Sequence, residues 1–208
     1  QGVISQRLMP SIGGGRVAQP PNYAGLLGLA HARLKTADPH ALVIAAGLAP
    51  TNENSLRAMD DRLFLEQLLA AQADHCFDVL AAHAYGFGQD PLAEHHNNGG
   101  GLHLGRLTAA HTILSRHQIN KPVWVTELGY TVNQGSQPAV TAQEQAAYLP
   151  TALERINQSW PWIELTTVWN LSYGLPSNDE IEGYSLLTTN VTPRPVYHTL
   201  QNFLHTPP

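Results

Sequence analysis

The feature that most constrains the fold of this chain is a regular alternation of helical and strand-like segments. Segments with apolar residues at helical spacing, or with helix-start signals, cover residues 21–39, 61–76, 105–118, 141–158 and 194–204. Short apolar runs rich in β-branched and aromatic residues lie at 41–48, 77–85, 122–130 and 162–171. Such runs are typical of strands that are buried on both faces. Strands that alternate with helices predict βαβ units and a parallel sheet.

The number of predicted strands shows whether the parallel sheet can form a complete barrel. Four strands, with a fifth candidate at 2–5, are too few for an eight-stranded barrel, which typically takes about 250 residues. The length of 208 residues suits one domain better than two. We therefore expect residues 1–208 to form a single α/β domain, an incomplete (β/α)8 barrel that comprises roughly the second half.

Local signals predict where several helices begin. Asn22 is a candidate N-cap for the first helix. Thr141 and Glu144 have the spacing of a capping box. Pro195 fits the first turn of the closing helix, where its missing N–H costs nothing.

Composition excludes several function classes. The formal net charge is −5, and no Lys/Arg-rich run is available to follow a phosphate backbone, so we expect no nucleic-acid partner. No stretch approaches the roughly 20 apolar residues needed to cross a bilayer, so we expect no membrane partner. The first residues show no signal-peptide pattern. The compartment is left open, because secretion fits and the native start can lie upstream of Gln1. The single Cys76 excludes an internal disulfide and is interpreted as a small buried hydrophobe.

Three predicted strands end in polar or aromatic side chains. Glu127 ends one, His83 and Tyr85 end the strand before it, and Trp169 ends the strand after it. Because the carboxyl ends of parallel strands meet at one rim, these side chains predict a site for a small molecule.

Strand periodicity also predicts which residues share a face with Glu127. Side chains alternate along a strand, so Val123, Val125 and Glu127 should face the same way. A carboxylate at the end of a buried strand is costly unless something uses it.

The rim segments resemble a known family. "FDVLAAHAYGF" (77–87), "KPVWVTELGY" (121–130) and "WPWIELTTVWNL" (160–171) are similar to the sixth, seventh and eighth strand segments of clan-A (β/α)8 glycoside hydrolases. The bacterial cellulase- and β-xylosidase-like members are the most similar. The similarity runs from about residue 22 onward. Its most specific pieces are T-E-x-G after a strand and H-x-Y one strand earlier.

The resemblance implies a role for each rim residue. Glu127 matches the nucleophile of retaining glycosidases, Tyr85 the tyrosine that hydrogen-bonds it, and His83 the histidine beside the sugar subsite. Trp169 matches the tryptophan under the sugar ring, and the adjacent Asn170 is expected to bind substrate. A hydroxyl donor favours an ionised carboxylate, and an indole face stacks well on sugar C–H groups.

The second carboxyl group of a retaining glycosidase is not evident. The family's acid/base glutamate lies in an Asn-Glu-Pro segment, whose place aligns with Ser5 and Gln6. An amide cannot protonate a leaving alcohol, so hydrolysis is expected to be impaired. Five carboxylates in the long segments 86–105 and 172–183 are alternatives, although solvated surface is the more common role of loop carboxylates. These are Asp90, Glu94, Asp179, Glu180 and Glu182.

Histidines raise the question of a metal. His95, His96 and His103 lie close together in a Gly/Asn-rich segment. Nothing in the sequence fixes their geometry, and ordering such a segment costs entropy. We therefore expect no metal and no cofactor.

The sequence therefore predicts a glycoside hydrolase-like protein that cleaves O-glycosidic bonds of a β-linked oligo- or polysaccharide by a retaining mechanism. Two alternatives stay open. One is a non-catalytic carbohydrate-binding protein. The other is a barrel fragment that depends on a partner, or self-associates, through its open sheet edge. The sugar, the linkage and the oligomeric state are not predicted.

Overall fold

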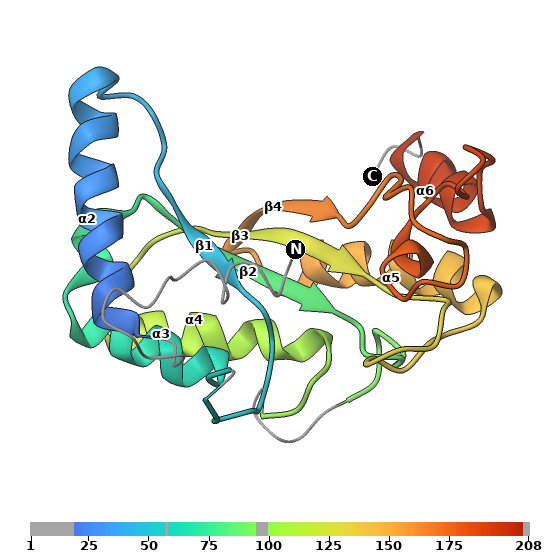
Figure 1. Ribbon diagram of the computed structural model, residues 1–208, viewed down its shortest axis with the longest axis horizontal. Helices are drawn as coiled ribbons and strands as arrows, with labels where there is room; N and C mark the ends of the chain where they lie inside the picture. Colours follow the sequence, from blue (N-terminus) through green and yellow to red (C-terminus); the bar gives the residue numbers. More distant parts are fainter. Residues whose placement is uncertain (1–18, 57, 95–99, 206–208) are drawn as a thin grey trace.

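The computed structural model of the protein describes residues 19–56, 58–94 and 100–205. Four parallel strands form the sheet in these residues, in the order β1 (Ile44–Leu48), β2 (Val79–Tyr85), β3 (Val123–Gly129) and β4 (Ile163–Val168). The helices are α2 (Pro20–Ala37), α3 (Asp61–Ala70), α4 (Leu107–Arg116), α5 (Ala142–Ser159) and α6 (Pro195–His205), and the short 3₁₀ turns are η1 (Ala73–Cys76), η2 (Leu104–Arg106) and η3 (Glu182–Tyr184). Each strand pairs with its neighbour in the sequence, and one of α3, α4 and α5 lies between successive strands (Figure 1).

The predicted alternation of strands and helices is confirmed, with differences at the ends of elements. The helix predicted over 61–76 ends at Ala70 and resumes as η1. Gln72 lies between the two in the left-handed region, with φ 58°. The candidate strand at 2–5, with Ser5 and Gln6, lies outside the described residues.

The helix-start signals had different outcomes. The Thr141 capping box is present, because the Glu144 N–H donates to Thr141 Oγ1 at 3.1 Å and the Thr141 N–H donates to Glu144 Oε2 at 2.7 Å. Pro195 begins α6, as expected. The Asn22 cap was wrong: α2 begins at Pro20, whose fixed φ suits the first helical position.

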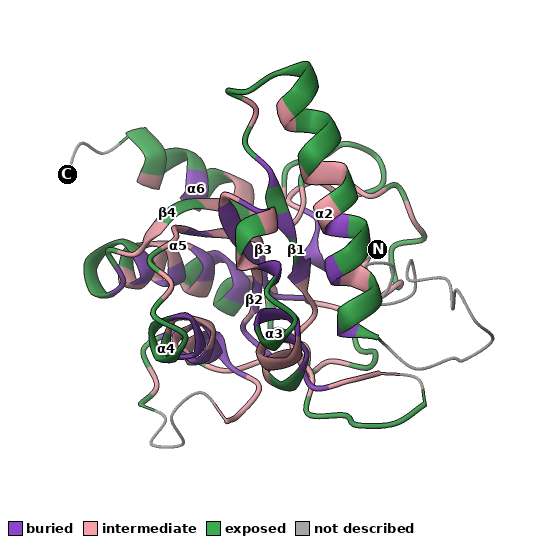
Figure 2. Cartoon of the chain, turned by 90° about the vertical axis from the view of Figure 1, so that its left-hand side faces the viewer, coloured by how far each residue is buried: buried purple, intermediate pink, exposed green. Residues whose placement is uncertain are grey.

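The helices cover one face of the sheet. One hydrophobic cluster joins α2, α3 and α4 to β1, β2 and the start of β3, and a second joins α5 and α6 to β2 and β3. In Figure 2 the buried residues lie on the strands and on the helix sides that face them. Cys76 is only partly buried and packs against the first cluster. No described helix is long and apolar enough to span a membrane.

The other face and the edges of the sheet are less covered. Ile44 on β1 and Leu165 on β4 are each 37% exposed. Within the described residues, β1 and β4 each pair on one side only, so the sheet is open. An open parallel sheet with helices on one face is an arc of a (β/α) barrel, as predicted for an incomplete barrel.

A bulge in β3 corrects the expected orientation of its side chains. Val125 pairs with Ala82 on β2, whereas the next pair is Glu127 with His83, so β3 has one extra residue at this point. Val125 and Leu128 both belong to the helix-facing core although they are three residues apart. The expectation that Val123 and Val125 share a face with Glu127 was therefore wrong, because the bulge changes the alternation before Glu127.

Candidate active site

The centre of the candidate site is the Glu127 carboxylate at the end of β3. The residue is 9% exposed. The Tyr85 hydroxyl donates a hydrogen bond to Glu127 Oε2. His83 Nδ1 lies 3.2 Å from the same oxygen, without the geometry of a hydrogen bond. The structure thus brings together three side chains that the sequence places at the ends of two neighbouring strands.

Strand pairing fixes this arrangement. His83 is the pairing partner of Glu127, and Tyr85 is the partner of Gly129. A side chain at Gly129 has no room, because its Cβ would lie 2.7 Å from the Trp169 carbonyl oxygen and 2.9 Å from the Tyr184 ring. The glycine that follows the carboxylate therefore lets β4 and the following loop approach the site.

Burial controls the protonation of the pair formed by Glu127 and Tyr85. Burial raises the pKa of Glu127, and the Tyr85 hydrogen bond partly offsets this by favouring the charged form. Burial and the neighbouring carboxylate raise the pKa of Tyr85 above its usual range. The phenol therefore keeps its proton and remains a hydrogen-bond donor at neutral pH.

His83 is a neutral group in this site. Burial lowers the pKa of His83 from 6.5 to about 4. Its ring lies against the backbone of β1, where a Cβ on Gly47 would overlap the imidazole. At neutral pH the imidazole therefore brings no positive charge to Glu127.

An aromatic pocket of about 240 Å³ shares Tyr85 with this site, although Glu127 itself is not among the residues that line it. Tyr85 and Trp169 both line it, so the residue that holds Glu127 also forms part of the pocket wall. The remaining lining is Ala49, Pro50, Phe87, Ser136, Gln137, Glu180, Ile181 and Tyr184. Tyr184 packs edge-on against Tyr85, with ring centroids 5.3 Å apart. Sequence reasoning missed Tyr184, because it follows no strand and no periodic pattern marks it.

Asn170 follows Trp169 through a cis peptide bond and does not line this pocket. Its Oδ1 accepts a hydrogen bond from Ser185 Oγ at 3.0 Å. Its Nδ2 is buried and makes no hydrogen bond within the described residues. In the structure, Asn170 therefore contacts Ser185, in the loop before α6, and does not line the pocket.

The loop carboxylates differ in their positions. Only Glu180 among them lines the aromatic pocket. Glu182 is fully buried and lies 3.8 Å from Arg194. Asp90 and Asp179 accept the N–H groups of Leu92 and Ile181, as in ordinary turns, and Glu94 is exposed.

The metal hypothesis gains no structural support. His95 and His96 lie outside the described residues, and His103 is a buried residue preceding η2. Among residues 19–56, 58–94 and 100–205, no three His, Cys, Asp or Glu side chains are grouped as metal ligands.

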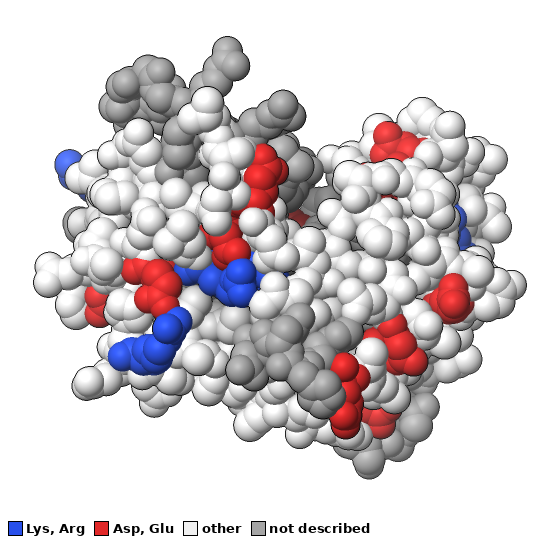
Figure 3. Space-filling view, turned by 90° about the horizontal axis from the view of Figure 1, so that it is seen from below, with Lys and Arg blue, Asp and Glu red and all other residues white. Residues whose placement is uncertain are grey.

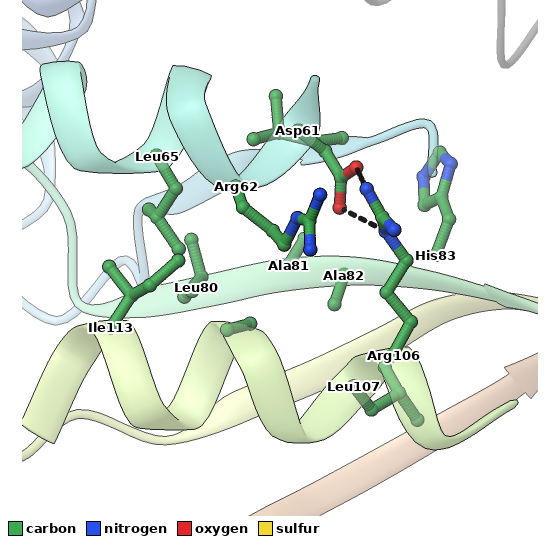
Figure 4. Close-up of a pocket in the computed structure, with 12 residues that line it drawn as sticks. Asp61, Arg62, Leu65, Leu80, Ala81, Ala82, His83, Arg106, Leu107 and Ile113 are labelled. Atoms are coloured by element: carbon green, nitrogen blue, oxygen red, sulfur yellow. Dashed lines mark hydrogen bonds and ion pairs between the residues drawn. The ribbon is translucent and has the colours of Figure 1, made fainter. Parts of the chain in front are cut away.

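A second, smaller cavity lies between β2 and the helices α3 and α4 (Figure 4). Its volume of about 30 Å³ has room for one or two waters and none for a sugar. Arg106 reaches across it to Asp61, and Arg106 Nε lies 3.0 Å from Asp61 Oδ1. Arg106 also donates to the Thr51 carbonyl at 2.7 Å and to Asn52 Oδ1 at 2.8 Å. This buried network joins the segment after β1 to the segment that precedes α4.

The charged residues that the structure describes form no large basic patch on the face shown in Figure 3, as expected from the lack of a Lys/Arg-rich run in the sequence. On the face shown in Figure 3, the largest group of Lys and Arg atoms lies directly beside Asp and Glu atoms. Arg62 and Arg116, for example, pair with Asp60 and Glu66. Opposite charges so placed largely cancel.

No protein-family model and no curated protein sequence matches this chain. Its fold does match solved structures of glycoside hydrolases. A glucosidase from Croceicoccus marinus aligns with a TM-score of 0.64 and 16% identity, over 89% of this chain and 36% of its own. A family 39 glycoside hydrolase from Bacteroides cellulosilyticus aligns at 0.60 and 19% identity, over 88% and 36%. A family 128 exo-β-1,3-glucanase from Aureobasidium namibiae aligns at 0.58 and 13%, over 90% and 62%.

These likenesses establish the fold. The protein has the architecture of part of a (β/α)8-barrel glycoside hydrolase, as the sequence resemblance implied. It spans about a third of the length of the first two structures.

Proposed function

We propose that this protein is a glycosidase of the retaining type that acts on β-linked oligo- or polysaccharides. The described residues supply the nucleophile of its active site. The observation that carries the proposal is the buried Glu127 carboxylate, held by the Tyr85 hydroxyl beside a pocket that Trp169 lines. The glycoside hydrolase fold supports the same chemistry.

Glu127 is the nucleophile in this proposal. The Tyr85 hydroxyl donates its hydrogen bond to Oε2 of Glu127. Oε1 accepts no hydrogen bond from the described residues, so it is the oxygen that attacks the anomeric carbon. Oε1 forms an ester bond with the anomeric carbon as the bond to the leaving oxygen breaks, and the leaving group takes that electron pair. Water then cleaves the ester, which releases the sugar and restores the carboxylate.

The leaving group determines how fast the first step can be. A departing alkoxide needs a proton, which a carboxylic acid about 5–5.5 Å from the nucleophile donates in retaining enzymes. Gln6, at the aligned position, lies outside the described residues and has no acidic proton. A phenol with a low pKa leaves without this help, so aryl glycosides are the substrates of choice for a test.

The test is to trap the sugar on Glu127. A 2-deoxy-2-fluoro β-glycoside with a dinitrophenyl leaving group forms the ester but slows its hydrolysis. We expect mass spectrometry to find one added sugar on the peptide that contains Glu127, and none in Glu127→Gln. Slow release of dinitrophenol from the ordinary glycoside should fall at least about 10³-fold in the same variant. Label on another residue, or unchanged release, would refute the proposal.

One observation favours a second function, a non-catalytic carbohydrate-binding protein. Among the described residues that line the aromatic pocket, Glu180 is the only carboxylate, and it is already held by other groups. A sugar could then bind without being cleaved. Saturable binding of oligosaccharides with no release of dinitrophenol would support this alternative.

The open sheet edges suggest a third property, self-association. Within residues 19–56, 58–94 and 100–205, β1 and β4 each have one edge with no paired strand, and such an edge can pair with another chain. Sedimentation measured over a range of protein concentrations tests this directly, because a monomer keeps one mass throughout.

A further inference from the structure

The aromatic pocket that Tyr85 and Trp169 line has a single charged residue among its described lining residues. Glu180 is the only Asp, Glu, Lys, Arg or His among its described lining residues. Aromatic rings and aliphatic groups make most of the wall, and Ser136 and Gln137 add two uncharged polar side chains. The wall of the pocket is therefore mostly apolar, and Glu180 is its one acidic residue.

Glu180 is fixed in place by the loop that follows β3. Its Oε2 accepts the Ser136 N–H at 2.7 Å, and its Oε1 accepts the Gln137 N–H at 3.0 Å. The Ser136 hydroxyl lies 3.0 Å from Oε2. A Cβ on Gly135 would overlap this carboxylate, so the loop needs glycine there. Both carboxylate oxygens thus accept hydrogen bonds, and two successive N–H groups form a good binding site for a carboxylate.

The main chain of the same residue is also held. The Thr131 hydroxyl donates to the Glu180 carbonyl at 2.9 Å, and Asn133 Nδ2 donates to the Asp179 carbonyl at 2.7 Å. The loop after β3 and the loop before α6 are thus joined by several hydrogen bonds. Glu180 is therefore held in a fixed position, although its side chain is partly exposed to solvent.

A positioned carboxylate has a clear preference among sugars. It accepts hydrogen bonds from hydroxyl groups, which every neutral sugar offers. It repels a sugar that carries its own carboxylate, and the repulsion is stronger where less water separates the two charges. Glu127, close to the same pocket through Tyr85, adds to the repulsion.

The size of the pocket sets how much of a substrate it holds. Its volume of about 240 Å³ is below the roughly 300–1,000 Å³ of pockets for drug-sized ligands. It therefore suits one sugar unit, with its ring on the aromatic wall and its hydroxyls toward Glu180.

We propose that Glu180 is a specificity-determining residue that makes this pocket select one neutral sugar unit and exclude uronic acids. The proposal rests on the function proposed above and adds the class of sugar. It needs no bond-forming step of its own.

The experiment compares matched substrates that differ only at carbon 6. Dinitrophenyl β-glucoside and β-glucuronide, and the corresponding galactose pair, are hydrolysed by the wild type, Glu180→Gln and Glu154→Gln. Glu154 is an exposed residue of α5, so its variant makes the same charge change outside the pocket. We expect the wild type to prefer the neutral sugar. Glu180→Gln should shift the ratio of kcat/KM about tenfold toward the uronide, whereas Glu154→Gln should not.

Binding provides a second readout that needs no turnover. Methyl β-glucoside and methyl β-glucuronide are titrated by NMR into Glu127→Gln, alone and combined with Glu180→Gln. Salt should improve uronide binding only where Glu180 is present, because screening weakens the repulsion. A merely structural role of Glu180 would not produce this salt dependence.

The outcomes separate the two proposals. If no glycoside is hydrolysed but neutral sugars bind and uronides do not, the proposed hydrolysis fails and the sugar preference stands. If uronides bind or react as well as neutral sugars, or if Glu180→Gln leaves the ratio unchanged, the inference about Glu180 is overturned. It is also overturned if neither methyl glycoside binds.

Discussion

At the scale of single residues, the hydrogen bond from Tyr85 to Glu127 decides how much of the carboxylate is ionised. Burial raises the pKa of Glu127, and the phenol hydrogen bond counteracts it. In Tyr85→Phe the pKa of Glu127 should rise further. The acidic limb of the kcat/KM profile for an aryl glycoside should then move to higher pH. At neutral pH kcat/KM should fall about 10- to 100-fold, because a hydrogen bond to a charged group is lost.

Tyr184→Phe is the control for this experiment. Its ring contacts Tyr85 but its hydroxyl makes no hydrogen bond to Glu127 within the described residues. We expect the acidic limb to stay where it is in this variant. A Tyr85→Phe profile that coincides with that of the wild type would show that the phenol does not tune the carboxylate.

The buried imidazole of His83 makes stability depend on pH. The pKa of His83 is about 4 in the folded protein, whereas an exposed histidine has a pKa of 6.5. Between these values the unfolded chain binds the additional proton, so the free energy of unfolding should rise with pH through this window. Glu127 changes the free energy of unfolding with pH in the opposite direction, because its pKa is raised on folding.

Urea unfolding of the wild type and of His83→Gln at pH 5 and pH 7 isolates the contribution of the histidine. The gain in stability between the two pH values should be smaller in the variant, and an equal gain would contradict the assignment.

At the scale of elements, the sequence predicts the order and type of strands and helices well. Apolar runs between helical segments indicated all four described strands of the sheet. The bulge in β3 was not predictable in the same way, since it depends on how Val125 and Glu127 pair with β2. The alternation rule assigned Val125 to the wrong face. The meeting of Tyr85 with Glu127 followed from their places at the ends of strands, whereas the position of Glu180 depends on contacts between two loops.

The N-cap of α5 illustrates a local signal with a measurable effect. Thr141 and Glu144 exchange hydrogen bonds that satisfy two N–H groups at the start of this helix. We expect Thr141→Ala to lower the free energy of unfolding by about 1 kcal/mol, as measured with urea. Thr112→Ala is the matched control. That residue is exposed in α4, and its hydroxyl only donates to the Thr108 carbonyl, so the change should cost little. Equal losses in the two variants would show that the cap contributes nothing special.

At the scale of the whole molecule, the loops that precede α3 and α4 are joined by a buried charge. Arg106 contacts Thr51, Asn52 and Asp61, which are 55, 54 and 45 residues away in the sequence. No local pattern indicates partners so distant, and sequence analysis therefore missed the network. It ties the loop after β1 to the loop after β2, and His83 lines the same small cavity.

Removing one partner from such a network leaves buried charge without compensation. The side chain of Arg106 is 4% exposed and that of Asp61 is 17% exposed. Arg106→Met keeps much of the side-chain length, yet it removes the counter-ion of Asp61 and the donor to the Thr51 carbonyl. We expect the free energy of unfolding to fall by about 3–5 kcal/mol, measured by urea unfolding.

Arg116→Met provides the comparison for a pair at the surface. Arg116 also pairs with an acidic residue, Glu66, but its side chain is 63% exposed. Exposed ion pairs contribute about 0–1 kcal/mol, so this variant should unfold close to the wild type. The difference between the two variants measures burial, because the chemical change is the same. Similar losses in both would mean that the loops before α3 and α4 are held together by their apolar contacts, and that the Arg106 network adds nothing to the stability of the sheet behind the site.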